Sequence, residues 1–127
     1  MNMVKFFNNF LITEDGKMMF MLCLIASTMI IDFVTGCIAA KIQNSFKSKE
    51  GINGILRKLC SMLLLIIFIP FSIIIPNNIG IALVYVLYVG YEVMELKSIV
   101  ENIKKMGGDT ELFTEFLNKT DDIIKKK

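Results

Sequence analysis

Three carboxylates lie inside long apolar stretches of this chain, where a lipid-facing segment would carry none. Asp32 falls within residues 18–40, and Glu92 and Glu95 fall within residues 79–99. An ionisable side chain near the centre of a transmembrane helix costs roughly 2.5 to 3.5 kcal/mol on insertion scales. Such side chains therefore face protein or water, and their presence on two segments predicts polar surfaces around which several copies assemble as a pore.

Asp32 belongs to a polar stripe. Thr28, Asp32 and Thr35 recur at i, i+4 and i+7, which places them on one face of a helix. Small residues follow on or beside this face, and they let two helix backbones approach closely. These candidate packing residues are Gly36, Ala39 and Ala40.

The two glutamates open a second stripe at helical spacing. Glu92 and Glu95 are followed on the same side by polar residues that continue beyond the apolar stretch. These are Ser98, Glu101 and Asn102. Together with the first stripe, Glu92 and Glu95 form the candidate pore face.

Each stripe has a second interpretation. Asp32 could belong to a static packing face, either neutral or paired with Lys41 or Arg57. The second stripe could be the solvated face of a helix that leaves the bilayer at Gly90. The residues alone leave these alternatives open.

Enzyme chemistry has little support in the composition. The sequence contains no histidine, and its three cysteines all lie within apolar segments and form no C-x-x-C pair. The commonest general base and the usual zinc ligands are therefore missing. We expect no catalytic residue, no metal or cofactor, and no nucleic-acid partner.

The elements that position these residues are long apolar helices. Hydrophobic residues make up 54% of the 127 residues, and the mean hydropathy is +0.61. About 20 apolar residues span the hydrocarbon core as a helix. The sequence predicts an all-α membrane protein with an N-terminal segment (1–17), a three-helix transmembrane domain (18–99) and a tail (100–127). The three spans are expected at about 18–40, 59–75 and 79–99.

Amphipathic helices are expected at both ends of the chain. Near the N-terminus, apolar residues from Met3 to Leu11 follow helical spacing, which is typical of a helix lying in the membrane interface. In the tail, Gly107 and Gly108 break the third span, and apolar residues from Leu112 to Leu117 share one face of a final helix.

Basic residues concentrate between the first and second spans, and they predict the orientation. This connection holds one acid, Glu50, against five cations, whereas the second connection holds no charge. The five are Lys41, Lys47, Lys49, Arg57 and Lys58. Because basic loops stay in the cytoplasm, we expect the N-terminus outside and the C-terminus inside.

A set of polar and small residues between Ile31 and Gly107 resembles the phage holin family of the toxin-secretion and phage-lysis type. The resemblance covers the aspartate, the basic connection and the end of the third span. It rests on Asp32, Thr35-Gly36, Ala39-Ala40-Lys41, Ser48, Gly51, Gly54, Arg57-Lys58, Glu95-Leu96, Ser98-Ile99, Glu101-Asn102 and Gly107.

The resemblance implies a holin. Such a protein accumulates in the bacterial cytoplasmic membrane, oligomerises with itself, and opens a lesion through which an endolysin or a toxin leaves the cell. The alternative is an antiholin, or a scaffold or anchor subunit, whose buried acids pair permanently with Arg57 and Lys58. A proton-coupled carrier would use the same carboxylates, but the chain shows no clear internal repeat.

Overall fold

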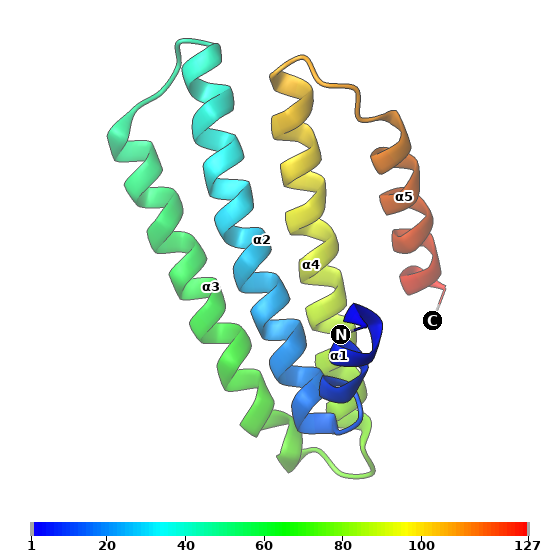
Figure 1. Cartoon of the computed structure of the whole chain (residues 1–127). Coiled ribbons are helices and arrows are strands. Elements are labelled where there is room, and N and C mark those ends of the chain that lie inside the picture. The colour runs from blue at the N-terminus through cyan, green and yellow to red at the C-terminus, as the bar shows by residue number, and fades with distance from the viewer. Residues whose placement is uncertain (1, 127) are drawn as a thin grey trace.

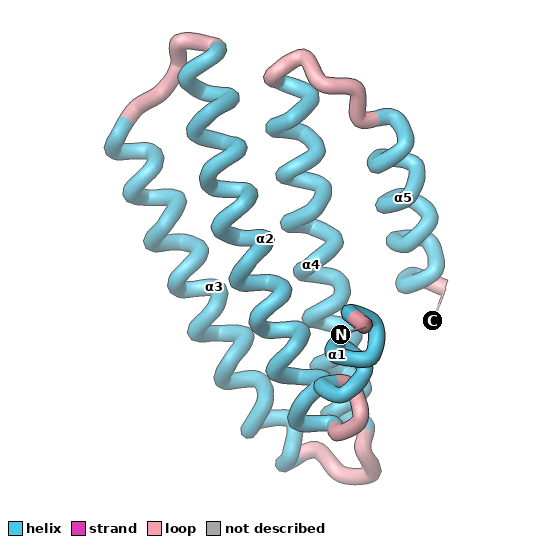
Figure 2. Tube along the Cα trace, viewed as in Figure 1, coloured by secondary structure: helices cyan, strands magenta, loops and turns pink. Residues whose placement is uncertain are grey.

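The computed structural model describes residues 2–126, apart from the side chain of Phe10, so Met1 and Lys127 of the expected terminal segments lie outside it. The described residues form five helices and no strand (Figures 1 and 2). They are α1 (Met3–Phe10), α2 (Glu14–Ile42), α3 (Ser48–Ile74), α4 (Ile79–Lys105) and α5 (Glu111–Lys125).

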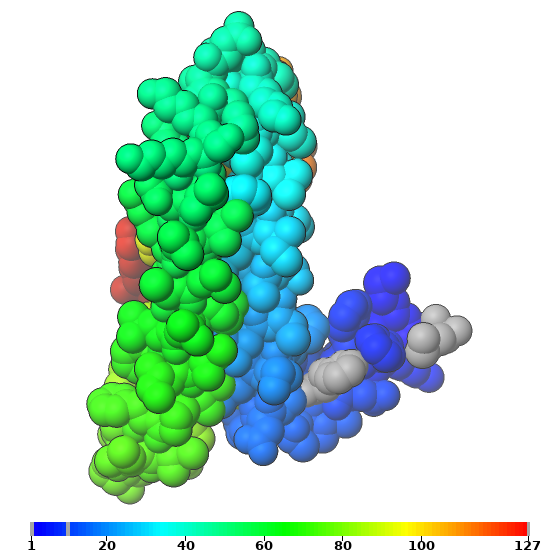
Figure 3. Space-filling view, turned by 90° about the vertical axis from the view of Figure 1, so that its left-hand side faces the viewer, coloured from blue at the N-terminus to red at the C-terminus, as the bar shows by residue number. Residues whose placement is uncertain are grey.

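The three long helices run up, down and up, and pack against one another as a bundle (Figure 1). Helix α5 returns beside the second half of α4, on the side away from α3. Helix α1 contacts α2 and projects from the flank of the bundle near the start of α2 (Figure 3).

Helices α2, α3 and α4 are long and apolar enough to cross a membrane, as the sequence predicts. They contain 29, 27 and 27 residues. At ~1.5 Å per residue each is about 40 Å long, so each extends beyond a ~30 Å hydrocarbon core. Charged residues can therefore occupy the ends of these helices without lying deep in lipid.

Helices α2 and α3 begin earlier than their apolar runs do, whereas α4 begins at the expected residue, Ile79. Helix α2 starts at Glu14 because the Thr13 hydroxyl caps it by accepting a hydrogen bond from the Gly16 amide. Helix α3 starts at Ser48, eleven residues before the expected span at 59, since hydropathy marks apolar residues whereas helical hydrogen bonding continues through charged ones. The segment expected as a basic loop is therefore largely helical.

Only one of the five basic residues lies in the connection itself. Lys41 is in the last turn of α2, and Lys49, Arg57 and Lys58 belong to α3. Lys47 remains between the helices as the residue before α3. The cations thus cluster at one end of the bundle, but they are spread over nearly three turns of α3.

The core lies mainly between α2 and α4. Tyr88 of α4 is fully buried, and its hydroxyl donates a hydrogen bond to the carbonyl oxygen of Leu65 in α3. The remaining buried apolar residues of this cluster are Met18, Leu22, Ile25, Met29 and Val84. Helix α3 contributes only Leu65 and Ser72 to the buried residues, and large aliphatic side chains elsewhere on it are exposed, as a lipid-facing surface requires.

The turn from α3 to α4 brings two backbones into close contact. Asn77 and Asn78 adopt positive φ angles of 63° and 61° in this turn, a conformation that asparagine tolerates well. A Cβ atom on Gly80 would overlap the carbonyl oxygen of Ser72. Glycine at position 80 is therefore required for α4 to cross α3 at this point.

Replacing Gly80 with alanine is expected to lower the free energy of unfolding by about 1 to 3 kcal/mol, because the new methyl group forces the two backbones apart. Thermal unfolding of the purified protein in detergent measures the loss. Gly90→Ala is the matched control, since a Cβ there meets nothing within 4 Å. Equal stability of the two variants would contradict the close crossing.

Candidate functional site

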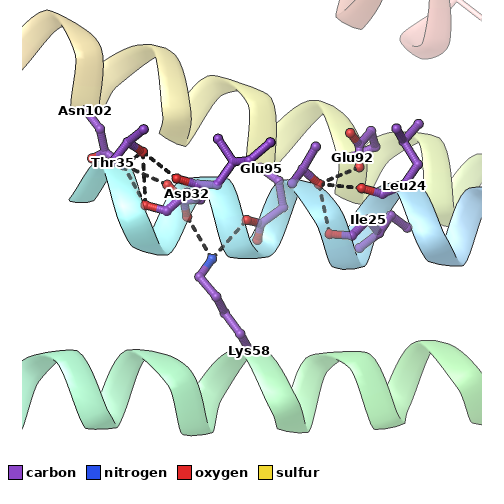
Figure 4. A network of polar contacts seen from close by, with 10 residues as sticks. Leu24, Ile25, Asp32, Thr35, Lys58, Glu92, Glu95 and Asn102 are labelled. Atoms are coloured by element: carbon purple, nitrogen blue, oxygen red, sulfur yellow. Dashed lines mark hydrogen bonds and ion pairs between the residues drawn. The ribbon is translucent and has the colours of Figure 1, made fainter. Parts of the chain in front are cut away.

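A lysine from α3 joins two carboxylates on two other helices. The Lys58 Nζ lies 2.7 Å from Oδ2 of Asp32 on α2 and 2.9 Å from Oε2 of Glu95 on α4 (Figure 4). Both acids are nearly buried, with 9% of Asp32 and 8% of Glu95 exposed. This bridge is the only ion pair in the described residues that connects α3 to the rest of the bundle.

The three bridged residues lie at one level of the bundle. Ten residues separate Asp32 from the end of α2 at Ile42, Glu95 from the end of α4 at Lys105, and Lys58 from the start of α3 at Ser48. At ~1.5 Å per residue, the bridge is about 15 Å from the end of the bundle that carries the basic connection.

Asn102 of α4 extends the network to the backbone of α2. Its Nδ2 lies 2.8 Å from Oδ1 of Asp32, 3.1 Å from the Asp32 carbonyl oxygen and 3.0 Å from Oγ1 of Thr35. The two amide hydrogens are thus shared among three acceptors. Asp32 is held from both sides, by a cation and by an amide.

Glu92 lies on the same face of α4 as Glu95, about one helical turn closer to the start of the helix. The Thr28 hydroxyl lies 2.9 Å from Oε2 of Glu92 and 2.9 Å from the Ile25 carbonyl oxygen, so it supplies one shared donor (Figure 4). Within the described part of the chain, Glu92 has no ion-pair partner. We call the group formed by Thr28, Asp32, Thr35, Lys58, Glu92, Glu95 and Asn102 the polar seam.

The polar seam contains three carboxylates and one ammonium group. In the described residues, every buried side-chain nitrogen and oxygen has a hydrogen-bond partner. Only one cation in the described part of the chain accompanies the three acidic side chains, however, and charge removed from water is costly unless an opposite charge matches it. The closed bundle is therefore well bonded but electrostatically unbalanced.

The small residues of α2 pack within the chain. Ala39 is buried with 2% of its surface exposed, and a Cβ on Gly36 would lie 3.5 Å from Nδ2 of Asn102. Gly36 and Ala40 also line a groove between α2 and α3. The structure thus places the expected packing face against α4 and α3 of the same molecule.

The two expected partners of Asp32 point elsewhere. Lys41 lies over the ring of Phe46, 5.3 Å from its centroid, and Arg57 is exposed. Lys58 takes their place because it is the cation on the inner face of α3. Lys47 and Lys49 are exposed as well.

The three polar residues at the end of the second stripe separate in the structure. Asn102 joins the polar seam, and Ser98 lines the groove between α2 and α3. Glu101 is exposed and lies 3.8 Å from Lys105 one turn later. In the described part of the chain, no cluster of three or more His, Cys, Asp or Glu side chains could hold a metal ion.

Comparison with known proteins assigns the chain to a family. Its sequence matches the profile of the bacteriophage holin family over residues 9–126. The chain belongs to the bacteriophage holin family. This confirms the resemblance drawn from the sequence, and together with the three apolar helices it supports a membrane location for this holin-family protein.

Curated relatives of this holin-family protein are named antiholins. It is 31% identical over 106 residues to the antiholin of Bacillus phage B103, and 31% identical over 109 residues to that of Bacillus phage phi29. Each match covers 82% of this chain and 79% of the relative. No solved structure matches it.

An ion pair connects the tail helix α5 of this holin-family protein to α4. Nζ of Lys97 lies 2.9 Å from Oδ2 of Asp121, and Nζ of Lys125 lies 3.3 Å from the same oxygen. Hydrogen bonds from Lys97 and then Lys125 hold the pKa of the Asp121 carboxyl below its usual value. The carboxylate is therefore charged at neutral pH, and its contribution is lost only as the pH falls through that lowered pKa.

From the sequence, Lys58 is expected to pair with the buried acids only in the alternative to the holin, although a further signal for the inward direction of this lysine exists. Lys58, Leu65 and Ser72 are spaced seven residues apart, and the latter two are the buried residues of α3. Seven residues correspond to about two helical turns, so all three share one face. A lysine in register with a buried leucine and a buried serine indicates a cation directed into the holin-family bundle.

Proposed function

We propose that this protein is a holin, which oligomerises in the bacterial cytoplasmic membrane and opens a non-selective lesion that releases an endolysin or a secreted toxin. The observation that carries the proposal is the polar seam, in which two nearly buried acidic side chains and a half-buried third one are accompanied by a single cation within an otherwise apolar bundle. The bilayer accepts the apolar shell, while the seam retains a drive toward water.

Assembly provides a way to satisfy that drive. A single bundle can hydrate its seam only by admitting water into lipid, which is costly. Several bundles arranged in a ring can turn their seams toward a shared aqueous centre while their apolar faces remain in contact with lipid. Thr28, Asp32, Thr35, Glu92 and Glu95 would then line the opening.

An antiholin is the second candidate, and two observations favour it. The curated relatives from Bacillus phages B103 and phi29 carry that name. In addition, the bridge through Lys58 lets a single chain satisfy its buried hydrogen-bonding groups without a partner. An antiholin would remain closed and restrain another lesion-forming protein.

Release of a cytoplasmic fluorescent protein separates the two functions. Bacteria that express the full chain alone should release a fluorescent protein of tens of kilodaltons, while uninduced cells retain it. Retention at a membrane level of the chain confirmed by immunoblot contradicts the holin. If co-expression with a separate lesion-forming holin then delays release, the antiholin is supported.

The orientation and the terminal helices complete the proposal. Four exposed cations lie at one end of the bundle, and this end is placed in the cytoplasm by the preference of basic residues for that side. They are Lys41, Lys47, Lys49 and Arg57. Helix α1 would lie in the outer membrane interface, and the tail that carries α5 would be on the cytoplasmic side.

Cysteine labelling in intact cells tests this orientation. In a background without the native cysteines, Asn8→Cys should react with a membrane-impermeant maleimide and Lys47→Cys should be protected, because only position 8 is outside. Both positions are exposed in the structure, so burial does not account for protection. Permeabilised cells should label both, and the opposite pattern in intact cells would reverse the orientation.

A further inference from the structure

The second half of helix α3 packs closely against α4. Gly80 lets the backbone of α4 approach the Ser72 carbonyl, and the Tyr88 hydroxyl donates to the Leu65 carbonyl. Leu65 and Ser72, the buried residues of α3, both lie in this half. The second half of α3 is thus held by close packing and by a hydrogen bond from a fully buried side chain.

The first half of α3 is held differently. A groove of about 270 Å³ separates it from α2, and Gly36, Cys37 and Ala40 line the α2 side. On the α3 side, a Cβ at Gly54 would meet nothing within 4 Å, and one at Gly51 would only touch the ring of Phe33 at 3.8 Å. In place of packed side chains, the Lys58 ammonium spans the space to α2 and α4 (Figure 4).

We propose that the first half of α3 is a lever that covers the polar seam, and that Lys58 is the latch that holds it closed. The crossing at Gly80 and Ser72, with the Tyr88 to Leu65 hydrogen bond, is the fixed end. When the latch releases, residues 48–58 swing away from α2 and expose Asp32 and Glu95. This inference rests on the proposed function in one respect, namely that the exposed seam then lines the lesion.

The charges of the seam explain why the latch is autoinhibitory. With Lys58 in place, the excess of carboxylates is partly neutralised and the lever stays closed. Without Lys58, Asp32 and Glu95 would be two neighbouring acidic groups with no cation between them, and water entering the groove that Asp32 lines would stabilise their charged forms. A single residue therefore sets how long the closed state persists.

The groove also contains a native reporter for the movement. Cys37 lies on its α2 side and is partly buried, whereas Cys23 and Cys60 are exposed elsewhere on the bundle. With Cys23 and Cys60 replaced by alanine, the rate at which a water-soluble maleimide modifies Cys37 measures how often the groove opens. A single chain in a nanodisc isolates this motion from assembly.

Lys58→Met should increase the Cys37 labelling rate on the order of tenfold or more, because breaking one side of a buried pair is strongly unfavourable to the closed form. Arg57→Met is the matched control, since Arg57 is exposed and forms no ion pair among the described residues, and its rate should equal that of the parent. Lys58→Arg should also remain close to the parent rate. A parent-like rate in Lys58→Met overturns the lever.

The same variant separates the lever from the lesion. Faster labelling of Lys58→Met together with earlier release of the fluorescent protein from cells supports both proposals. Faster labelling with no release from cells, in either parent or variant, supports the lever and rejects the holin function.

A second measurement applies if Lys58→Met fails to accumulate. Ala40→Cys and Gly54→Cys lie on opposite sides of the groove, so a flexible bismaleimide can join them and lock the lever in a chain that keeps Lys58. The cross-linked chain should lose release, whereas a cross-link between Phe71→Cys and Leu83→Cys at the fixed end should not. Release that persists after the first cross-link overturns the lever.

Discussion

Asparagine in place of Asp32 is expected to leave the amount of protein in the membrane unchanged or raised, and to delay permeabilisation several-fold or abolish it. The substitution reduces the seam to two carboxylates and one ammonium group, which lowers the cost of placing charge within the bilayer. Lys58 keeps Glu95 as its partner. Asn102 can turn its amide to accept from the new side chain. The closed bundle thus becomes more stable, and the drive to hydrate the seam decreases.

Immunoblot and dye entry on the same culture measure both effects. Asp15→Asn is the matched control, since Asp15 is an exposed aspartate in the first turn of α2 and lies outside the seam. It should permeabilise on the parent schedule. A fall in the amount of Asp32→Asn, restored by a second change of Lys58 to methionine, would show that Asp32 serves the fold and would contradict the pore role.

Alanine in place of Tyr88 is expected to have the largest effect on stability. The side chain is fully buried at the meeting point of α2, α3 and α4, and its hydroxyl bonds to Leu65. Its removal leaves a cavity and costs about 3 to 5 kcal/mol in the free energy of unfolding. Because the helices associate in lipid mainly through such packing, the loss should release the second half of α3.

Thermal unfolding in detergent compares Tyr88→Ala with two further variants. Tyr88→Phe keeps the ring and removes one hydrogen bond, so it should cost only ~1 kcal/mol. Leu87→Ala, at a neighbouring position where 38% of the side chain is exposed, should cost less than Tyr88→Ala by several-fold. If Tyr88→Ala and Leu87→Ala unfold at the same temperature, Tyr88 does not anchor the bundle.

The three long apolar helices could be predicted from the sequence, because a helix that crosses a bilayer needs about 20 consecutive apolar residues. The two polar stripes were predictable as faces, since their spacing follows the 3.6-residue period. The contact between the two stripes could not be predicted, because the spacing of residues along one helix does not say which other helix packs against that face. The structure brings Thr28 to Glu92 and Asp32 to Asn102.

The role of Lys58 depends on features that hydropathy does not report. Lys58 follows Arg57 directly at the entrance of an apolar run, and both residues contribute equally to a count of positive charges. A lysine stem is long and flexible enough to reach in either direction. Its direction is set by the rotation of α3 about its own axis, which the contacts of Leu65 and Ser72 determine. The pore role of the seam remains a prediction.

The bridge lies about ten residues from one end of each long helix, so it is displaced from the helix midpoints toward the end of the bundle that carries the basic connection. This displacement links the closed state to the thickness of the leaflet on that side of the bilayer. In bilayers with short acyl chains, headgroup water reaches closer to Asp32 and Glu95, so the closed form is strained less and should persist longer. In bilayers with long chains the same charges lie deeper, and dye entry into reconstituted vesicles should begin sooner. Lipid composition would thus set how long the closed state persists before dye entry begins.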